Sequence, residues 1–154
     1  GPGKLPASKE RHDAYMTALK KNKIKYAEQN VVNSDLTIDG NNEAMKTLLF
    51  LARRPTAIIA FNDYVAMDAI HYAKRNKVKI NKDICFVSFA NEAICNYMEH
   101  PPLASIEQFP YEQGAKATEI LLDLLEKDNE DSPDKPVKFH NVLLPSQLVV
   151  RISK

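Results

Sequence analysis

The chain has 154 residues, of which 44% are apolar and 27% are charged. This apolar content is enough for one globular domain and excludes intrinsic disorder, which requires low hydrophobicity and high net charge. The formal net charge of +1 excludes a free-standing module that binds DNA or anionic lipid through charge alone. No apolar run approaches the roughly 20 residues of a membrane-spanning helix, so we expect a soluble protein that has no membrane partner.

The N-terminal third predicts two helices with a strand between them. Ser8 can cap a first helix that ends near Asn22. Residues 25–32 then predict a short strand. Asp39 can cap a second helix whose apolar residues recur at helical spacing and which stops before Pro55. The apolar face of this second helix is expected to hold Met45, Leu48, Leu49 and Ala52.

Two continuous apolar runs follow, at residues 57–61 and 84–89. Continuous rather than alternating apolarity is typical of strands that are covered on both faces, as in a parallel sheet. A helix follows the first run, and a short helix over residues 91–98 follows the second. The buried face of the former is expected to hold Val65, Ala66, Ala69, Ile70 and Ala73. The alternation predicts right-handed βαβ units and therefore an α/β fold with a parallel sheet.

The C-terminal part predicts one long helix among short strands. Pro110 suits the first position of that helix, which runs to residue 126, because the missing N–H of proline has no helical partner there in any case. Its apolar stripe is made by Ala117, Ile120, Leu121, Leu124 and Leu125. Strands are expected at residues 103–108, 137–144 and 148–152, with a polar loop over residues 127–136.

No motif in the sequence carries catalytic, nucleotide-binding or metal-binding chemistry. The chain has only four glycines, and neither a phosphate-binding glycine loop nor a nucleophile elbow is present. Cys85 and Cys95 make neither a disulfide framework nor a metal knuckle, which favours a reducing cytoplasm, and we expect Cys85 to be a core residue. The histidines lack metal-ligand spacing and are expected at the surface or as caps: His12, His71, His100 and His140. We therefore predict a protein that is not an enzyme and uses no metal or cofactor.

Polar residues follow the two apolar runs directly, at the carboxyl ends where open α/β sheets bind ligands. These residues are Asn62 and Asp63 after the first run, and Asn91 and Glu92 after the second. The simpler interpretation is that Asn62 or Asp63, and also Asn91, cap the helices that they precede, and one residue can serve both roles. Arg11 lies near a helix start, where the helix dipole disfavours a cation, which indicates a polar partner for its guanidinium.

Four segments in order resemble the effector-binding region of the lactose/galactose repressor family of bacterial transcription regulators. They read PTAIIAFNDYVA from Pro55, DICFVSFAN from Asp83, PPLASIEQ from Pro101 and LLPSQLVVR from Leu143. The N-terminus is similar as well, because Gly1-Pro2 and SKERHDAY from Ser8 match the family pattern GP, S-x-x-R-x-x-G-[FYW], with Ala14 in place of the glycine. The resemblance covers nearly the whole chain.

The resemblance implies a periplasmic-binding-protein-like (type I) lobe, together with a helix and strand that belong to a second, truncated lobe. Residues 1–108 would form the effector-binding lobe, residues 109–144 would cross into the truncated lobe, and residues 145–154 would return. The chain would then be a fragment that lacks an N-terminal helix-turn-helix for operator DNA. We expect the apolar stripe of the helix at residues 110–126 to be covered by another chain or by a rearranged copy of this one.

The resemblance also assigns a site for a small effector, a sugar or a related molecule, between the two lobes. Arg11, Asn62 and Gln108 match positions that hydrogen-bond the effector in such regulators, and Phe89 can stack on a ring. The family has an aspartate where this chain has Ala90, so an acidic contact is absent and Asn91 is the polar side chain that can compensate. The implied function is effector sensing and homodimerisation in a cytoplasmic regulator, the alternative being an extracytoplasmic solute-binding protein of a transport system.

Overall fold

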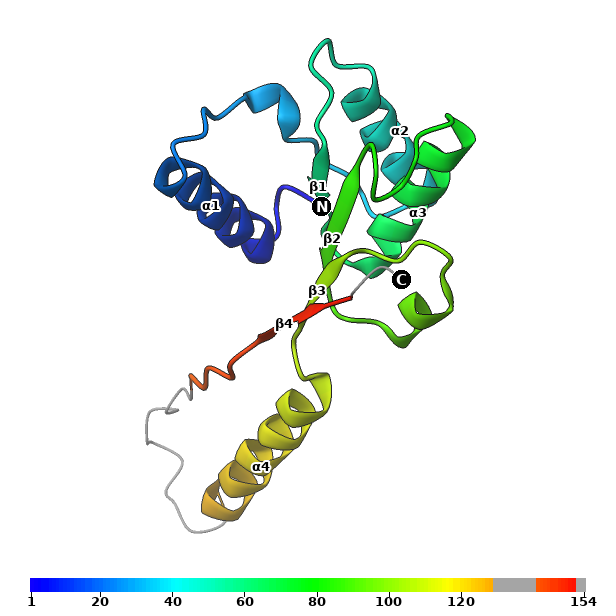
Figure 1. Cartoon of the computed structure of the whole chain (residues 1–154). Helices are drawn as coiled ribbons and strands as arrows, with labels where there is room; N and C mark the ends of the chain where they lie inside the picture. The colour runs from blue at the N-terminus through cyan, green and yellow to red at the C-terminus, as the bar shows by residue number, and fades with distance from the viewer. Residues whose placement is uncertain (129–140, 152–154) are drawn as a thin grey trace.

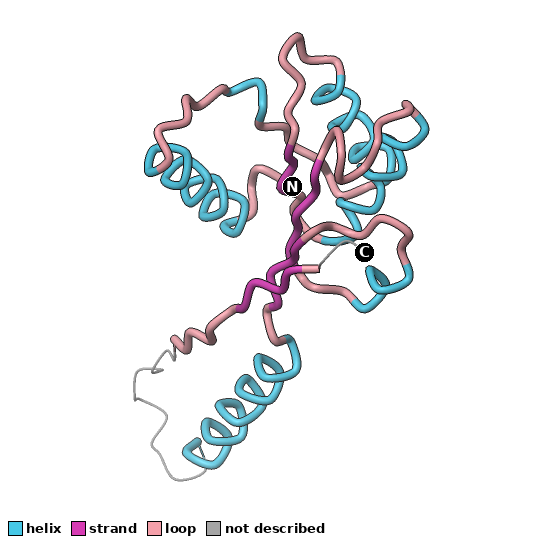
Figure 2. The backbone as a smooth tube through the Cα atoms, in the orientation of Figure 1, coloured by secondary structure: helices cyan, strands magenta, loops and turns pink. Residues whose placement is uncertain are grey.

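The computed structural model describes residues 1–128 and 141–151. Four strands form one sheet in the order β1-β2-β3-β4. Their bounds are Ala57–Ile59 for β1, Cys85–Phe89 for β2, Ala104–Glu107 for β3 and Gln147–Val150 for β4. The first three strands are parallel, and β4 runs antiparallel to β3. The strands are the magenta segments of Figure 2. The predicted α/β fold with a mainly parallel sheet is confirmed.

The helices lie on both sides of this sheet (Figure 1). They are α1 (Pro6–Lys21), α2 (Ile38–Leu49), α3 (Asp63–Arg75) and α4 (Pro110–Asp128), with short 3-10 helices η1 (Glu28–Asn30) and η2 (Ala93–Tyr97). α2 and α3 lie on one side of β1, whereas α1 lies on the other side of that strand and α4 points away from the sheet. None of the helices in the described ranges has both the length and the apolarity needed to cross a membrane.

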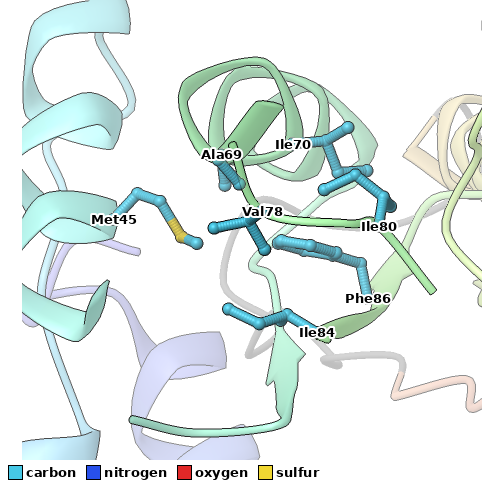
Figure 3. Close-up of a cluster of buried hydrophobic side chains, with 8 residues drawn as sticks. Met45, Ala69, Ile70, Val78, Ile80, Ile84 and Phe86 are labelled. Atoms are coloured by element: carbon cyan, nitrogen blue, oxygen red, sulfur yellow. The ribbon is translucent and has the colours of Figure 1, made fainter. Parts of the chain in front are cut away.

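The hydrophobic core lies between α2, α3 and the sheet. In Figure 3, Met45 of α2 points toward Val78 and Ala69, and the ring of Phe86 from β2 lies beneath them. The cluster is completed by Ile70, Ala73, Ile80 and Ile84. Helical spacing identified the buried face of α3 correctly, because Ala66, Ala69, Ile70 and Ala73 are all buried and Val65 is half-buried. This core packs β2 against α3. The polar residues that follow the strands lie beside these two elements.

Two predicted helix caps and one helix end were wrong. α1 begins at Pro6, and Ser8 lies inside the helix, where its hydroxyl donates to the Pro2 carbonyl at 2.7 Å. Proline at the first position starts α1 earlier because it needs no partner for an N–H. In α2 the cap is Thr37, which accepts from the Gly40 N–H at 3.0 Å, and Asp39 lies within the first turn. α2 ends at Leu49, so Ala52 lies beyond it and is exposed.

The strand predicted over residues 25–32 is absent. The segment contains the 3-10 helix η1 instead, and β1 is the edge strand of the sheet. A lone extended segment leaves its backbone N–H and C=O groups unpaired, so its apolar residues are not enough to make a strand. The expectation that residues 57–61 are covered on both faces was also wrong, because Ile59 on this edge strand is 58% exposed.

The C-terminal elements agree with the predictions in part. β3, α4 and β4 are confirmed, and the predicted short helix after β2 is the 3-10 helix η2. Of the strand expected over 137–144, residues 141–144 form no strand and residues 137–140 lie outside the described residues, as does His140. Leu121 and Leu122 of α4 are 55% and 54% exposed, so cover of this part of α4 by another chain stays a prediction.

Removal of the α2 cap gives a measurable stability change. Thr37→Ala is expected to lower the free energy of unfolding by about 1 kcal/mol, because the Gly40 N–H loses its acceptor. Urea denaturation measures this change. Thr47→Ala, an exposed threonine of the same helix, is the matched control and should leave stability unchanged or slightly raised, since alanine is the better helix former. Equal losses in the two variants would contradict the assignment of the cap.

Candidate functional site

The side chain of Arg11 is the centre of the candidate site. Its guanidinium carbon lies 4.6 Å from the ring centroid of Phe61 and 3.8 Å from that of Phe89, so the two rings contact the cation. Nη1 also donates to the Phe61 carbonyl at 2.7 Å. α1 thereby places a cation at the carboxyl ends of β1 and β2. Phe61 was missed as a site residue, although an aromatic residue directly before Asn62 at a strand end was the available signal.

Arg11 has no acidic partner in the part of the chain that the structure describes. No carboxylate of those residues lies at ion-pair distance from the guanidinium. Burial lowers the pKa of Arg11. The site is therefore positively charged and is not neutralised from within the described chain.

Asn62 and Gln108 are the two amide side chains predicted for the site, and both are half-buried. The side-chain oxygen of Asn62 accepts from the Val65 N–H at 2.9 Å, which confirms that Asn62 caps α3. Its amide nitrogen donates to no described residue, so one side chain can serve both predicted roles. Gln108 directly follows β3, and its side chain likewise has no hydrogen bond to the described residues. Contact of either amide with a ligand stays a prediction.

Asp63, the other candidate cap, is turned into the sheet and fully buried. Its carboxylate accepts hydrogen bonds from the Ser88 hydroxyl, from the Ser105 hydroxyl at 3.1 Å and from the Glu92 N–H at 2.6 Å. The thiol of Cys95 lies beside it, and burial, followed by the charge of Asp63, raises the pKa of that thiol to about 11. The carboxylate therefore ties the start of α3 to β2, β3 and the loop after β2.

Asn91 belongs to a structural network rather than to a helix cap, since η2 begins after Glu92. Its Nδ2 donates to Glu107 at 2.9 Å, and its Oδ1 accepts from Arg151 Nη2 at 2.6 Å. The hydrogen bond from Asn91, followed by one from the Phe109 N–H, holds the pKa of Glu107 below its usual range. Each amide atom of Asn91 has one partner within the chain and one further hydrogen-bonding position, so contact of Asn91 with a ligand in place of the absent aspartate stays a prediction.

Phe89 and Ala90 lie at the carboxyl end of β2, next to the predicted site. One face of the Phe89 ring is in contact with Arg11, so the chain itself occupies a surface that was predicted to stack on a ligand ring. Ala90 brings no polar atom to the site, and its φ of 95° is a left-handed conformation that disfavours a side chain. Asn91 next to it also has a positive φ, of 56°. The loop after β2, in which Ala90 replaces the aspartate of the resembled family, is therefore held in a strained backbone conformation.

Relief of this strain is a direct test of the loop geometry. Ala90→Gly is expected to raise the free energy of unfolding by about 0.5 to 1 kcal/mol, because glycine adopts positive φ without steric cost. Thermal or urea unfolding measures the change. Ala93→Gly, an exposed alanine in η2, is the control and should destabilise the protein. A destabilising Ala90→Gly would contradict the conformation of the loop.

Taken together, the site offers binding groups and no catalytic set. Among the described residues no group of histidine, cysteine, aspartate or glutamate side chains is arranged to hold a metal. His71 is exposed, His12 and His100 are half-buried, and Cys85 is half-buried rather than a full core residue. Arg11 lies against the rings of Phe61 and Phe89, and the amides of Asn62 and Gln108 follow β1 and β3. Guanidinium and amide groups of this kind are typical of small-molecule recognition.

The sequence matches the family described as periplasmic binding protein-like domain over residues 1–153. It is 30% identical to the HTH-type transcriptional repressor CytR of Escherichia coli (strain K12) over 151 residues, which are 98% of this chain and 42% of CytR.

Two solved structures are similar in fold. A regulatory protein of the LacI family from Chloroflexus aggregans gives a TM-score of 0.81 at 25% identity, covering 97% of this chain and 51% of that protein. The cellobiose complex of the transcriptional regulator CelR gives 0.82 at 25% identity, covering 97% and 43%. The chain thus spans about half, or less, of the length of each of these three proteins.

Proposed function

Because this chain belongs to the periplasmic binding protein-like domain family, we propose that it is the effector-sensing region of a LacI-family transcriptional regulator. The observation that carries the proposal is the position of Arg11 between two aromatic rings at the carboxyl ends of β1 and β2. Ligands of open α/β sheets bind at such an edge. The family resemblance read from the four sequence segments is confirmed by the relatives and by the similar structures.

The dimensions of the site fit a small polyol or ring. Ile59 at the end of β1 pairs with Val87, two residues before the end of β2, and Phe89 at the end of β2 pairs with Ile106, one residue before the end of β3. Two strand spacings, about 10 Å, then separate the strand end before Asn62 from the one before Gln108. A sugar or related molecule at this edge can reach both amides and Arg11. We therefore assign the predicted ligand contacts to Arg11, Asn62 and Gln108.

The proposed mechanism is a shift between two conformations of the whole regulator. Residues 1–108 would hold the effector and residues 109–144 would reach into a second lobe, after which the chain returns to the sheet as β4. The effector binds one lobe arrangement more tightly and so changes the geometry of a homodimer and its affinity for operator DNA. A helix-turn-helix for that DNA is expected elsewhere in the full-length protein, since the CytR repressor is described as HTH-type.

The relatives favour a regulator over the two other functions. A solute-binding protein of a transport system would share the fold, but CytR is a repressor, and the two similar structures are described as regulators. Catalysis is disfavoured for the same reason. We accordingly place the full-length protein in the cytoplasm, where its DNA is.

The test uses the full-length protein and DNA chosen by in vitro selection. Its affinity for the selected DNA is measured with and without each member of a panel of sugars, sugar acids, sugar phosphates and nucleosides. At least one compound is expected to change the affinity by about fivefold or more, the size of an ordinary allosteric coupling. Failure to select any DNA, or DNA binding that no compound changes, would contradict the proposed function.

Asn62→Asp refines this test because aspartate keeps the oxygen that caps α3 and loses the amide N–H that faces the ligand. We expect the variant to unfold like the wild type and to need about tenfold more compound for the same response. Thr37→Asp is the control: it keeps the cap of α2, which contributes no residue to the site, and should leave the response unchanged. An unchanged response in Asn62→Asp would remove this residue from the site.

A further inference from the structure

We infer that the effector is an anion: a small polyol or ring that carries a carboxylate or phosphate group, bound by Arg11. The inference rests on the proposed effector site and narrows its ligand. The observation behind it is that the site contains one cation and no compensating anion among the described residues. An oxyanion is the natural partner of a guanidinium, because its oxygens match the fork of N–H donors.

Arg11 keeps most of its donors free. Of the five guanidinium N–H groups, the described residues accept from Nη1 alone, at the Phe61 carbonyl. The rings of Phe61 and Phe89 contact the cation and supply no hydrogen-bond acceptor. Contacts of this kind fix the direction in which the guanidinium points and leave the remaining N–H groups available to a ligand.

Two acidic side chains at this end of the sheet are engaged elsewhere. Asp63 accepts from Ser88, Ser105 and the Glu92 N–H inside the sheet. Glu107 accepts from Asn91 and from the Phe109 N–H. Neither carboxylate reaches Arg11. Ala90 directly follows Phe89, whose ring lies against the guanidinium. It contributes a methyl group at the position where regulators of the resembled family have an aspartate.

The two amides differ in what they can offer: Asn62 has only its NH₂ group left, whereas the side chain of Gln108 has no hydrogen bond to the described residues and can donate or accept. The oxygen of Asn62 is used by the Val65 N–H, so this residue presents its NH₂ group to a ligand. A neutral sugar needs acceptors for its hydroxyl protons as well as donors, and among Arg11, Asn62 and Gln108 the one side-chain oxygen free to accept is that of Gln108. Such a donor-rich site selects ligands whose oxygens are acceptors only, which describes carboxylate and phosphate groups.

Burial adds an energetic reason. The guanidinium is partly withdrawn from water, which lowers the pKa of Arg11, and a charge taken out of water without a partner is costly. An anionic ligand removes this cost on binding, whereas a neutral ligand adds to it by displacing the remaining water. The site therefore discriminates between two ligands that differ only in charge.

The test titrates the full-length protein with matched probes by calorimetry. Glucose, galactose and ribose are each compared with the corresponding sugar acid and sugar phosphate, and inorganic phosphate is added as a competitor. We expect at least one anionic probe to bind about tenfold more tightly than its neutral counterpart, and inorganic phosphate to weaken that binding. Tighter binding of the acid or of the phosphate identifies which anionic group the site takes.

Two variants of Ala90 separate the effect of an added negative charge from the effect of added volume. Ala90→Asp adds a carboxylate to the residue after Phe89, whose ring lies against Arg11. The variant should weaken the preferred anionic probe by about tenfold or more and remove the preference over the neutral sugar. Ala90→Asn adds nearly the same volume without the charge and should retain the preference. Aspartate and asparagine both tolerate the positive φ at this position better than most residues do, so both variants are expected to fold.

The outcomes separate this inference from the proposed function. A neutral sugar that binds as tightly as both of its anionic forms would overturn the inference and leave effector sensing in place. The inference is also overturned if no anionic probe, inorganic phosphate included, binds at about 10 mM, or if the Asp and Asn variants at position 90 behave alike. Anion binding that leaves the affinity for the selected DNA unchanged would instead contradict the proposed function.

Discussion

Replacement of Asp63 by alanine is expected to lower the free energy of unfolding by about 3 kcal/mol. The carboxylate is fully buried and accepts from Ser88, Ser105 and the Glu92 N–H. The two hydroxyls can turn toward one another, since their oxygens lie 3.3 Å apart, but the Glu92 N–H is left without an acceptor. Denaturation in urea, followed by circular dichroism, measures the loss.

Two further variants show whether hydrogen bonding is the cause. Asp63→Asn keeps the volume and replaces one acceptor oxygen by a donor, so we expect a loss of about 2 kcal/mol. Asp39→Ala removes an exposed carboxylate from the first turn of α2 and should cost no more than about 0.5 kcal/mol. If Asp63→Ala were no more destabilising than Asp39→Ala, the buried network would not hold the sheet and α3 together.

Replacement of Arg11 by alanine is expected to weaken effector binding by about 1 to 3 kcal/mol, or roughly 5- to 150-fold in the dissociation constant. The guanidinium would be lost both as a cation and as a hydrogen-bond donor, and the Phe61 and Phe89 rings would lose the group that lies against them. Calorimetric titration of the full-length variant with the tightest probe of the panel measures the effect.

Arg11→Lys separates charge from shape. Lysine keeps the charge but lacks the planar fork, so we expect it to bind more weakly than arginine and more tightly than alanine. Lys9→Ala, two residues away and paired with Asp13 on the exposed side of α1, is the control and should leave the titration unchanged. Equal affinities in the wild type and in Arg11→Ala would remove Arg11 from the site.

Periodicity in the sequence predicted the elements that pack against one another within this chain. The buried face of α3 and the parallel pairing of β1 with β2 are as expected, because helical spacing reports a buried helix face directly. The apolar run at residues 57–61 predicted a strand correctly but not its cover on both faces. The prediction of a strand over residues 25–32 was wrong because a local pattern does not show whether a neighbouring strand is present. A strand is stabilised by its neighbour, and among the described residues no strand lies beyond the β1 edge.

The candidate site was predictable in its residue types but not in its contacts. Asn62 was identified as both a cap and a site residue from its place at a strand end, and the cap is confirmed. The pairing of Asn91 with Glu107 and Arg151 was not, because it joins residues up to 60 positions apart. The contact of Phe61 with Arg11 spans 50 positions and depends on how α1 lies against the sheet, which no local pattern reports.

A crystal structure of the full-length protein with its tightest probe tests the central claim most directly. We predict that the probe lies at the carboxyl ends of β1, β2 and β3, with an anionic oxygen within hydrogen-bond distance of the Arg11 guanidinium and with the Asn62 amide donating to it. A probe bound at any other place in the fold, with Arg11 making no contact to it, would contradict the account.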